Sequence, residues 1–166
     1  MQFPICQVCL KNDILCNGCA EKVGNEEIKI DEIKMFRRLN ELLKDQKSLR
    51  DVEIKRVVGN DLIMIIAKKG DISKLIGKEG RVVRKLSQEL EKSVKIIEQS
   101  SDINDFVKEV FSSVPVLGIN VVYKPEGKMY KIRIRKTERD KLPLSSELFA
   151  SVARSLFNIN TDIVFE

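Results

Sequence analysis

The sequence predicts an α+β protein in which a small metal-binding module precedes two compact segments. All four cysteines fall within the first 19 residues, and none occurs later in the chain. After them, segments whose apolar residues follow helical spacing alternate with short runs rich in Val and Ile, which are typical of strands. A content of 43% hydrophobic and 33% charged residues allows a buried core. A chain of 166 residues therefore fits one moderate domain or, better, two small ones.

The cysteines form two C-x2-C pairs, Cys6 with Cys9 and Cys16 with Cys19. Each pair can place two thiolates on one ion, and two facing pairs complete the tetrahedral four-sulfur cage that a structural Zn²⁺ prefers. Gly18 can relieve the tight turn of the second pair with a positive φ. We therefore expect one Zn²⁺, bound by all four cysteines, in a module that spans residues 1–25.

Three other chemistries compete with zinc at these cysteines. Iron in the same cage stays open, because ligand type alone does not separate it from zinc. Two disulfides would need an oxidising compartment or a hyperthermophilic source, and the start of the chain has no secretory signal. A redox-active pair is the weakest alternative, because no thioredoxin-like strand and helix surround it. The expected role of the module is structural, with a surface that can dock on a partner.

A linking helix and a strand pair follow the module. Residues 31–47 place apolar side chains at helical spacing, with Asp31 as the expected N-cap, and form the amphipathic helix of a linking segment, residues 26–50. Residues 52–58 then predict a strand, Gly59-Asn60 a tight turn, and residues 62–67 a second strand that is apolar on both faces. We expect this second strand to be the central one of its sheet.

Residues 70–90 read as a short helix, a glycine turn and a longer helix, and residues 94–97 as a strand. The purely structural interpretation of the turn is that Gly77 caps one helix and Gly80 begins the next. However, residues 68–95 contain nine Lys or Arg against four acids, an excess equal to the net charge of +5. A helix N-terminus with basic side chains suits a phosphate. The expected phosphate contacts are Lys78, Arg81, Arg84 and Lys85.

The sequence Ile76-Gly77-Lys78-Glu79-Gly80 between two helices resembles the Ile-Gly-x-x-Gly signature of type II KH domains, whose element order is α-β-β-α-α-β. Residues 94–108 resemble the strand, acidic turn and helix that follow the first KH domain of NusA-type transcription factors, and archaeal NusA-like proteins are the nearest family. The resemblance implies a KH domain over residues 51–114. In this family the turn, here Gly77, Lys78, Glu79 and Gly80, clamps the backbone of about four nucleotides. The bases would lie in a groove lined by Ile72, Leu75, Ile76, Val83 and either Ile96 or Ile97, although each of these is equally explained as core.

Residues 115–166 read as two strands (117–123 and 129–136), a helix (145–157) and a strand (162–165). This order resembles a second, degenerate KH-like β-β-α-β unit. It is degenerate because no Gly-x-x-Gly lies between Arg139 and Ser146, so no second backbone clamp is expected.

In the second predicted strand of this unit, Lys131, Arg133 and Arg135 alternate with Tyr130, Ile132 and Ile134 and form a basic row on one face. The alternative is that this row is an ordinary solvent-exposed sheet face with no binding role. Residues 124–141 nevertheless hold eight Lys or Arg against three acids, so two basic segments lie in an otherwise acidic chain. Such a distribution is typical of a track for RNA, and Lys131, Arg133 and Arg135 are further candidate contacts.

The composition argues against an enzyme. The chain has no histidine, which is the usual general base, and no cysteine beyond the metal module. No membrane span, signal peptide or small-molecule site is expected, and the predicted location is cytoplasmic. The predicted function is single-stranded RNA binding, which the NusA-like resemblance places in transcription elongation or termination. The alternative is an adaptor whose zinc ribbon docks on RNA polymerase or the ribosome.

Overall fold

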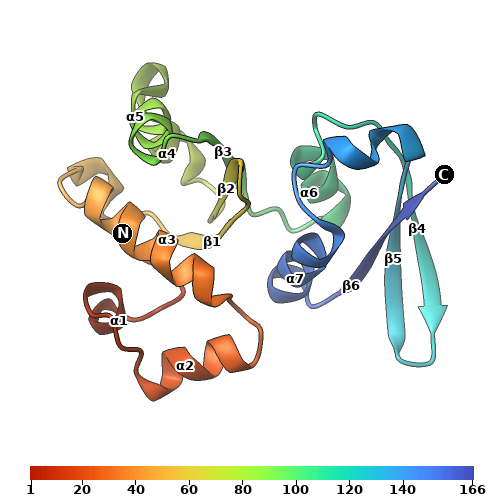
Figure 1. Cartoon of the computed structure of the whole chain (residues 1–166), viewed down its shortest axis with the longest axis horizontal. Coiled ribbons are helices and arrows are strands. Elements are labelled where there is room, and N and C mark those ends of the chain that lie inside the picture. Colours follow the sequence, from red (N-terminus) through yellow and green to blue (C-terminus); the bar gives the residue numbers. More distant parts are fainter. The chain divides into compact units, whose positions relative to one another are not determined.

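The computed structural model describes residues 1–166 and divides the chain into two compact units, Met1–Gln99 and Ser100–Glu166 (Figure 1). The KH domain predicted over residues 51–114 groups residues 100–114 with the segment before them. In the structure this stretch belongs to the second unit, because its Phe106 ring lies 6.1 Å from the ring of Phe149 and 5.2 Å from that of Phe157. None of the helices is long and apolar enough to cross a membrane.

The first unit combines two short helices at the cysteines, a longer helix and a three-stranded sheet with a helical pair. In chain order its elements are α1 (Gln7–Lys11), α2 (Asn17–Gly24), α3 (Ile30–Leu43), the 3₁₀ helix η1 (Lys47–Leu49), β1 (Ile54–Val58), β2 (Leu62–Ala67), α4 (Ile72–Ile76), the 3₁₀ turn η2 (Lys78–Gly80), α5 (Arg81–Leu90) and β3 (Ser93–Glu98).

The sheet of the first unit has the order β1-β2-β3, with β1 antiparallel and β3 parallel to β2. The prediction that the second strand is central is confirmed, and residues 63–67 of β2 are all buried, as a strand apolar on both faces requires. The N-terminus extends the sheet beyond β1, because the N–H of Gln2 donates to Val52 and its carbonyl accepts from Ile54, both at 2.8 Å. Helix, strand pair, helical pair and strand thus follow in the expected order.

Helix α3 differs from its prediction at both ends. It ends at Leu43 rather than at residue 47, and the predicted cap Asp31 is wrong. The carboxylate of Glu32 instead accepts from the N–H of Lys29 at 2.8 Å. The same carboxylate accepts from Arg56 Nε and Nη2, both at 2.7 Å, and from the N–H of Val57 at 3.2 Å. Because Glu32 is 5% and Arg56 1% exposed, this buried pair fixes α3 against β1.

The second unit repeats this strand arrangement. Its elements are α6 (Ile103–Val110), β4 (Val116–Lys124), β5 (Gly127–Ile134), the 3₁₀ helix η3 (Lys136–Lys141), α7 (Ser146–Phe157) and β6 (Asn160–Phe165). The sheet order is β4-β5-β6, again with an antiparallel pair followed by a parallel one. Its core is aromatic and aliphatic, with Phe106, Phe111, Phe149, Ile132 and Ile134 at most 1% exposed. The chain is therefore a mixed α+β protein with two three-stranded sheets, as the sequence predicted at this level.

Candidate metal centre and nucleic-acid interface

Each C-x2-C pair lies at the start of a short helix. Cys6 and Cys16 occupy the N-cap positions of α1 and α2, and Cys9 and Cys19 follow in the first turns. The free N–H groups at a helix N-terminus favour negative charge. Cys6 and Cys16, at the N-caps, are thus placed where thiolates, which are the form that binds a metal, are stabilised.

The four thiols converge on one point. Their Sγ atoms all lie within 4.8 Å of one another, Cys6 and Cys16 are 3.9 Å apart, and no disulfide joins them. A tetrahedral Zn²⁺ with Zn–S bonds of about 2.3 Å needs sulfurs about 3.8 Å apart. Backbone N–H groups of Cys6 and Cys16 also donate to Cys19 Sγ and Cys9 Sγ, at 3.3 and 3.1 Å. The residues therefore fit a four-thiolate metal ion, which would supply a structural crosslink.

The thiols divide into an exposed pair and a buried pair. The backbone N–H of Cys9 lowers the pKa of Cys6 to about 7, and that of Cys19 lowers the pKa of Cys16. At Cys9 the N–H of Cys16 lowers the pKa, but burial and the neighbouring thiols outweigh it and raise the pKa to about 12. Burial likewise raises the pKa of Cys19. The exposed thiols are the more readily ionised ones.

Two cations hold the first cysteine loop against the rest of the unit. Arg37 of α3 donates from Nε to the carbonyl of Cys9 at 3.0 Å, and Lys22 of α2 donates to the carbonyl of Pro4 at 2.7 Å. Cys9 and Cys19 belong to the same buried cluster as Phe36 of α3. The metal module is therefore part of the core of the first unit. Helical periodicity does not single out Arg37 or Lys22, because their partners are backbone carbonyls far away in sequence.

The glycine turn between α4 and α5 has a backbone that only glycine or a strained residue can adopt. Gly77 has φ 76° and Gly80 φ 73°, and Glu79 between them lies at φ 56°. A Cβ on Gly77 would lie 2.6 Å from the side chain of Val82, which no real contact allows. Gly77 is thus required by lack of space for a Cβ, whereas Gly80 has that space and is favoured by its left-handed backbone. The result is a compact turn directly before the N-terminus of α5.

Four basic side chains were expected to contact phosphate at this turn, and they fall into two groups. Lys78 and Arg81 are exposed and form no ion pair or hydrogen bond with the protein. Arg84 instead donates from Nε to the carbonyl of Gly80 at 3.4 Å and from Nη2 to the carbonyl of Glu79. Lys85 donates to the carbonyl of Leu42 at 3.2 Å, in the last turn of α3. Of these four side chains, Lys78 and Arg81 are thus the two that have no protein partner.

The apolar residues around the turn are mostly core. Leu75 and Ile97 are fully buried, and Ile96 is 7% exposed, whereas Ile76, directly before the turn, is 38% exposed. Ile72 and Val83 are half-buried and pack on the core cluster. Of the candidate groove residues, Ile76 is therefore the one most open to a ligand.

The predicted basic row on β5 is present, but one of its cations is occupied. Ile132 and Ile134 are buried, so Lys131 and Arg133 point to the other face of the sheet. Arg133 makes a double ion pair with Glu166, at 2.6 and 2.9 Å, which raises the pKa of Arg133 and lowers that of Glu166. Arg135, just after β5, is exposed. Sequence spacing could not reveal the Glu166 partner, because Glu166 directly follows β6, the parallel neighbour of β5, and is distant in sequence.

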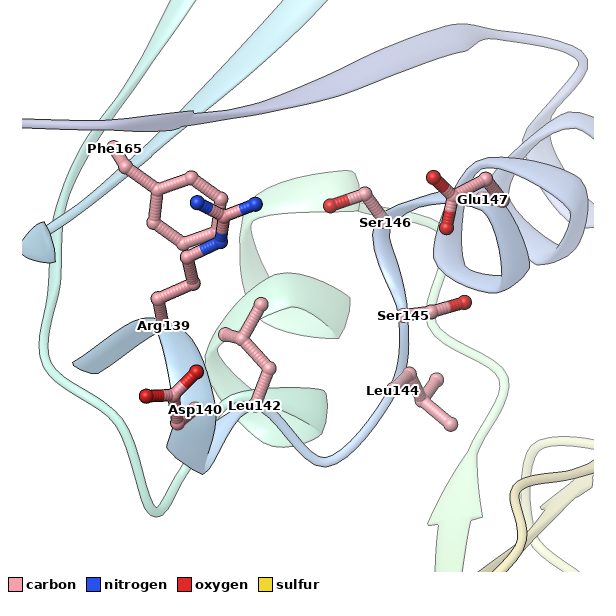
Figure 2. Close-up of a pocket in the computed structure, with 8 residues that line it drawn as sticks. All are labelled: Arg139, Asp140, Leu142, Leu144, Ser145, Ser146, Glu147 and Phe165. Carbon is pink, nitrogen blue, oxygen red and sulfur yellow. The ribbon is translucent and has the colours of Figure 1, made fainter.

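In the second unit a pocket of about 310 Å³ adjoins the segment between η3 and α7, which corresponds in element order to the glycine turn (Figure 2). Ser145 caps α7 by accepting from the N–H of Leu148 at 3.2 Å. Arg139 lies over the ring of Phe165, 5.4 Å from its centre. The pocket is lined by Arg139, Asp140, Leu142, Leu144, Ser145, Ser146, Glu147 and Phe165. Two acids against one base make it a poor site for phosphate.

Comparison with known proteins gives limited matches. No family model matches the chain. Over 55 residues it is 33% identical to the probable transcription termination protein NusA of Methanococcus vannielii, a match that covers 33% of this chain and 32% of the relative. The crystal structure of APE1850 aligns with a TM-score of 0.53 and 20% identity, covering 84% of this chain and all of that one. The first match is a local similarity to a NusA-like archaeal protein, and the second concerns the fold alone.

Proposed function

We propose that the protein binds single-stranded RNA in the cytoplasm as a NusA-like factor of transcription elongation or termination, without catalytic activity. One observation carries the proposal: the Gly77–Gly80 turn stands at the N-terminus of α5, with two basic side chains, Lys78 and Arg81, that have no protein partner. Such a turn offers backbone N–H groups and free cations to one phosphate backbone. The local similarity to a NusA protein supports the same reading.

In this proposal the segment from α3 to β3 acts as a type II KH domain. Its element order and its antiparallel and parallel strand pairs support this assignment. Gly77 to Gly80 would clamp the backbone, and Ile76 would contact a base. The second unit would be a degenerate copy that lacks the clamp, with Lys131 and Arg135 as further contacts. Archaeal RNA polymerase would be the working context.

We further propose that the four cysteines hold one Zn²⁺. The convergence of the thiols within 4.8 Å supports a four-sulfur site, and zinc is the usual ion of structural sites of this composition. Iron is the alternative. Metal analysis of protein purified without added metal separates the two, since a ferric four-thiolate centre is coloured and zinc is not.

The RNA proposal is tested by fluorescence anisotropy with short single-stranded oligonucleotides and duplexes of the same length. Binding should favour the single strand and weaken steeply with salt, because each phosphate contact releases counterions. Equal binding to duplex, or an affinity that barely changes between low and moderate salt, would contradict the proposed clamp.

A second candidate function, a protein-docking adaptor, is favoured by apolar side chains exposed on the metal module. Val8 on α1 is 65% exposed and Ile14, between the cysteine pairs, is 83% exposed. An adaptor should keep its polymerase or ribosomal partner when Lys78 and Arg81 are made acidic, and lose it when Val8 and Ile14 become Ser. The reverse result would support the RNA proposal.

A further inference from the structure

The hairpin of β4 and β5 carries both tyrosines of the chain on one face. Tyr123 lies opposite Lys128 in the strand register, and Tyr130 lies opposite Val121. Cross-strand partners share a face and alternate residues return to it, so these four side chains lie together. The same face carries the buried Ile132 near the other end of β5. The hairpin therefore changes along its length from core to an exposed aromatic surface.

The tip of this hairpin lies beyond its neighbouring strand. β6 pairs only with residues 129–134 of β5, and Figure 1 shows the hairpin turn, in cyan, reaching past β6. On this face Tyr123 is 76% exposed and Val121 41% exposed. The Lys128 ammonium lies 5.5 Å from the centre of the Tyr123 ring. An aromatic ring left this open, with a cation beside it, contributes little to the core.

The charges around Tyr123 indicate what kind of ligand fits. Lys124 and Lys128 flank the hairpin turn, neither forms an ion pair, and Glu126 is the single acid there. Because Lys124 directly follows Tyr123 on β4, its side chain lies on the opposite face, and the Tyr123 surface combines a flat ring with the Lys128 charge. An unpaired nucleotide matches both, because its base can stack on the ring and its phosphate can meet a lysine. A purely apolar protein partner on this face would leave the Lys128 ammonium without a counter-charge.

We propose that Tyr123, with Lys128 beside its ring, is a stacking platform for an unpaired base of single-stranded RNA. The platform belongs to the second unit and is a contact additional to the glycine turn of the first. The inference rests on the proposed RNA-binding function and adds a residue that contacts the face of a base rather than the backbone. Stacking of this kind tolerates any base, so the platform contributes affinity more than sequence preference.

The chain provides its own optical probe for this test. It has no Trp and only two Tyr, both on this hairpin, so its tyrosine emission reports on the hairpin alone. A single-stranded oligonucleotide should quench this emission, whereas an abasic oligonucleotide of equal length and charge should not. Tyr123→Ala should weaken RNA binding at least about fivefold, as expected for loss of one stacked base. Tyr123→Phe, which keeps the ring, should bind like the native chain.

Several results would overturn the platform. Equal affinity for normal and abasic strands would do so, as would native affinity in Tyr123→Ala while variants of the glycine turn lose binding. In that second case the proposed function would survive without the platform. Failure of the native chain to bind any RNA would remove both. If Tyr123→Ala changed the sedimentation coefficient and left RNA affinity unchanged, this face would be a contact between copies of the chain.

Discussion

Arg84→Met should weaken RNA binding without changing its dependence on salt. The guanidinium of Arg84 donates to the carbonyls of Glu79 and Gly80, the two turn residues in left-handed conformation. It therefore holds the turn in shape and is not free to contact phosphate. Each of these exposed hydrogen bonds contributes on the order of 0.5–1 kcal/mol. Losing both costs about 1–2 kcal/mol, or roughly a five- to thirtyfold increase in Kd.

The assay is anisotropy on a single-stranded oligonucleotide at four or five salt concentrations, with Lys78→Met as the matched variant. Lys78→Met removes a cation that has no protein partner, so the slope of log K against log salt should become shallower by about 0.7. Arg84→Met should leave that slope at the native value while shifting the whole line to weaker binding. If both variants flatten the slope equally, Arg84 contacts phosphate and the positioning role is wrong.

Two further predictions concern the framework of the first unit. Glu32→Gln should lower the free energy of unfolding by about 3–5 kcal/mol, because it leaves the buried Arg56 charge unpaired. The control Glu41→Gln, at an exposed ion pair, should change this free energy by less than about 0.5 kcal/mol. Urea unfolding measures both, and equal effects would contradict the stabilising role of the buried pair. Chelation of the metal from protein loaded with Co²⁺ should unfold α1 and α2, with loss of helical circular dichroism and of the Co²⁺ absorption band. Strands β4, β5 and β6 should stay protected in hydrogen exchange. Unchanged spectra would rule out a structural metal.

Local patterns predicted the elements of this fold well, while long-range polar pairs could not be foreseen. Residues 62–67 are apolar throughout, which is why a central, doubly covered strand could be expected there. The start of α3 depends instead on Glu32, whose carboxylate accepts from the N–H of Lys29 and also binds Arg56 of β1, 24 residues later. Helical periodicity carries no information on such a partner.

The candidate site was likewise predictable from local sequence patterns only in part. C-x2-C spacing sufficed to predict that the thiols converge, and the position of the glycines sufficed to predict a turn between two helices. Which cations stay free at that turn depended on geometry, because the carbonyls that hold Arg84 and Lys85 become accessible only after folding. Alternation along β4 likewise places Tyr123 on the face that carries Ile132, but it does not reveal that Tyr123 is exposed.

The most direct test of the central claim is anisotropy of single-stranded RNA with the double variant Lys78→Asp, Glu79→Asp. Asp is tolerated at the left-handed Glu79 position, and circular dichroism should verify that the variant folds. Lys108→Asp, which makes the same charge change at an exposed site on α6, serves as the control. The account predicts a large loss of affinity in the double variant and near-native binding in the control. Native affinity in the double variant would contradict the account and move the RNA to another surface.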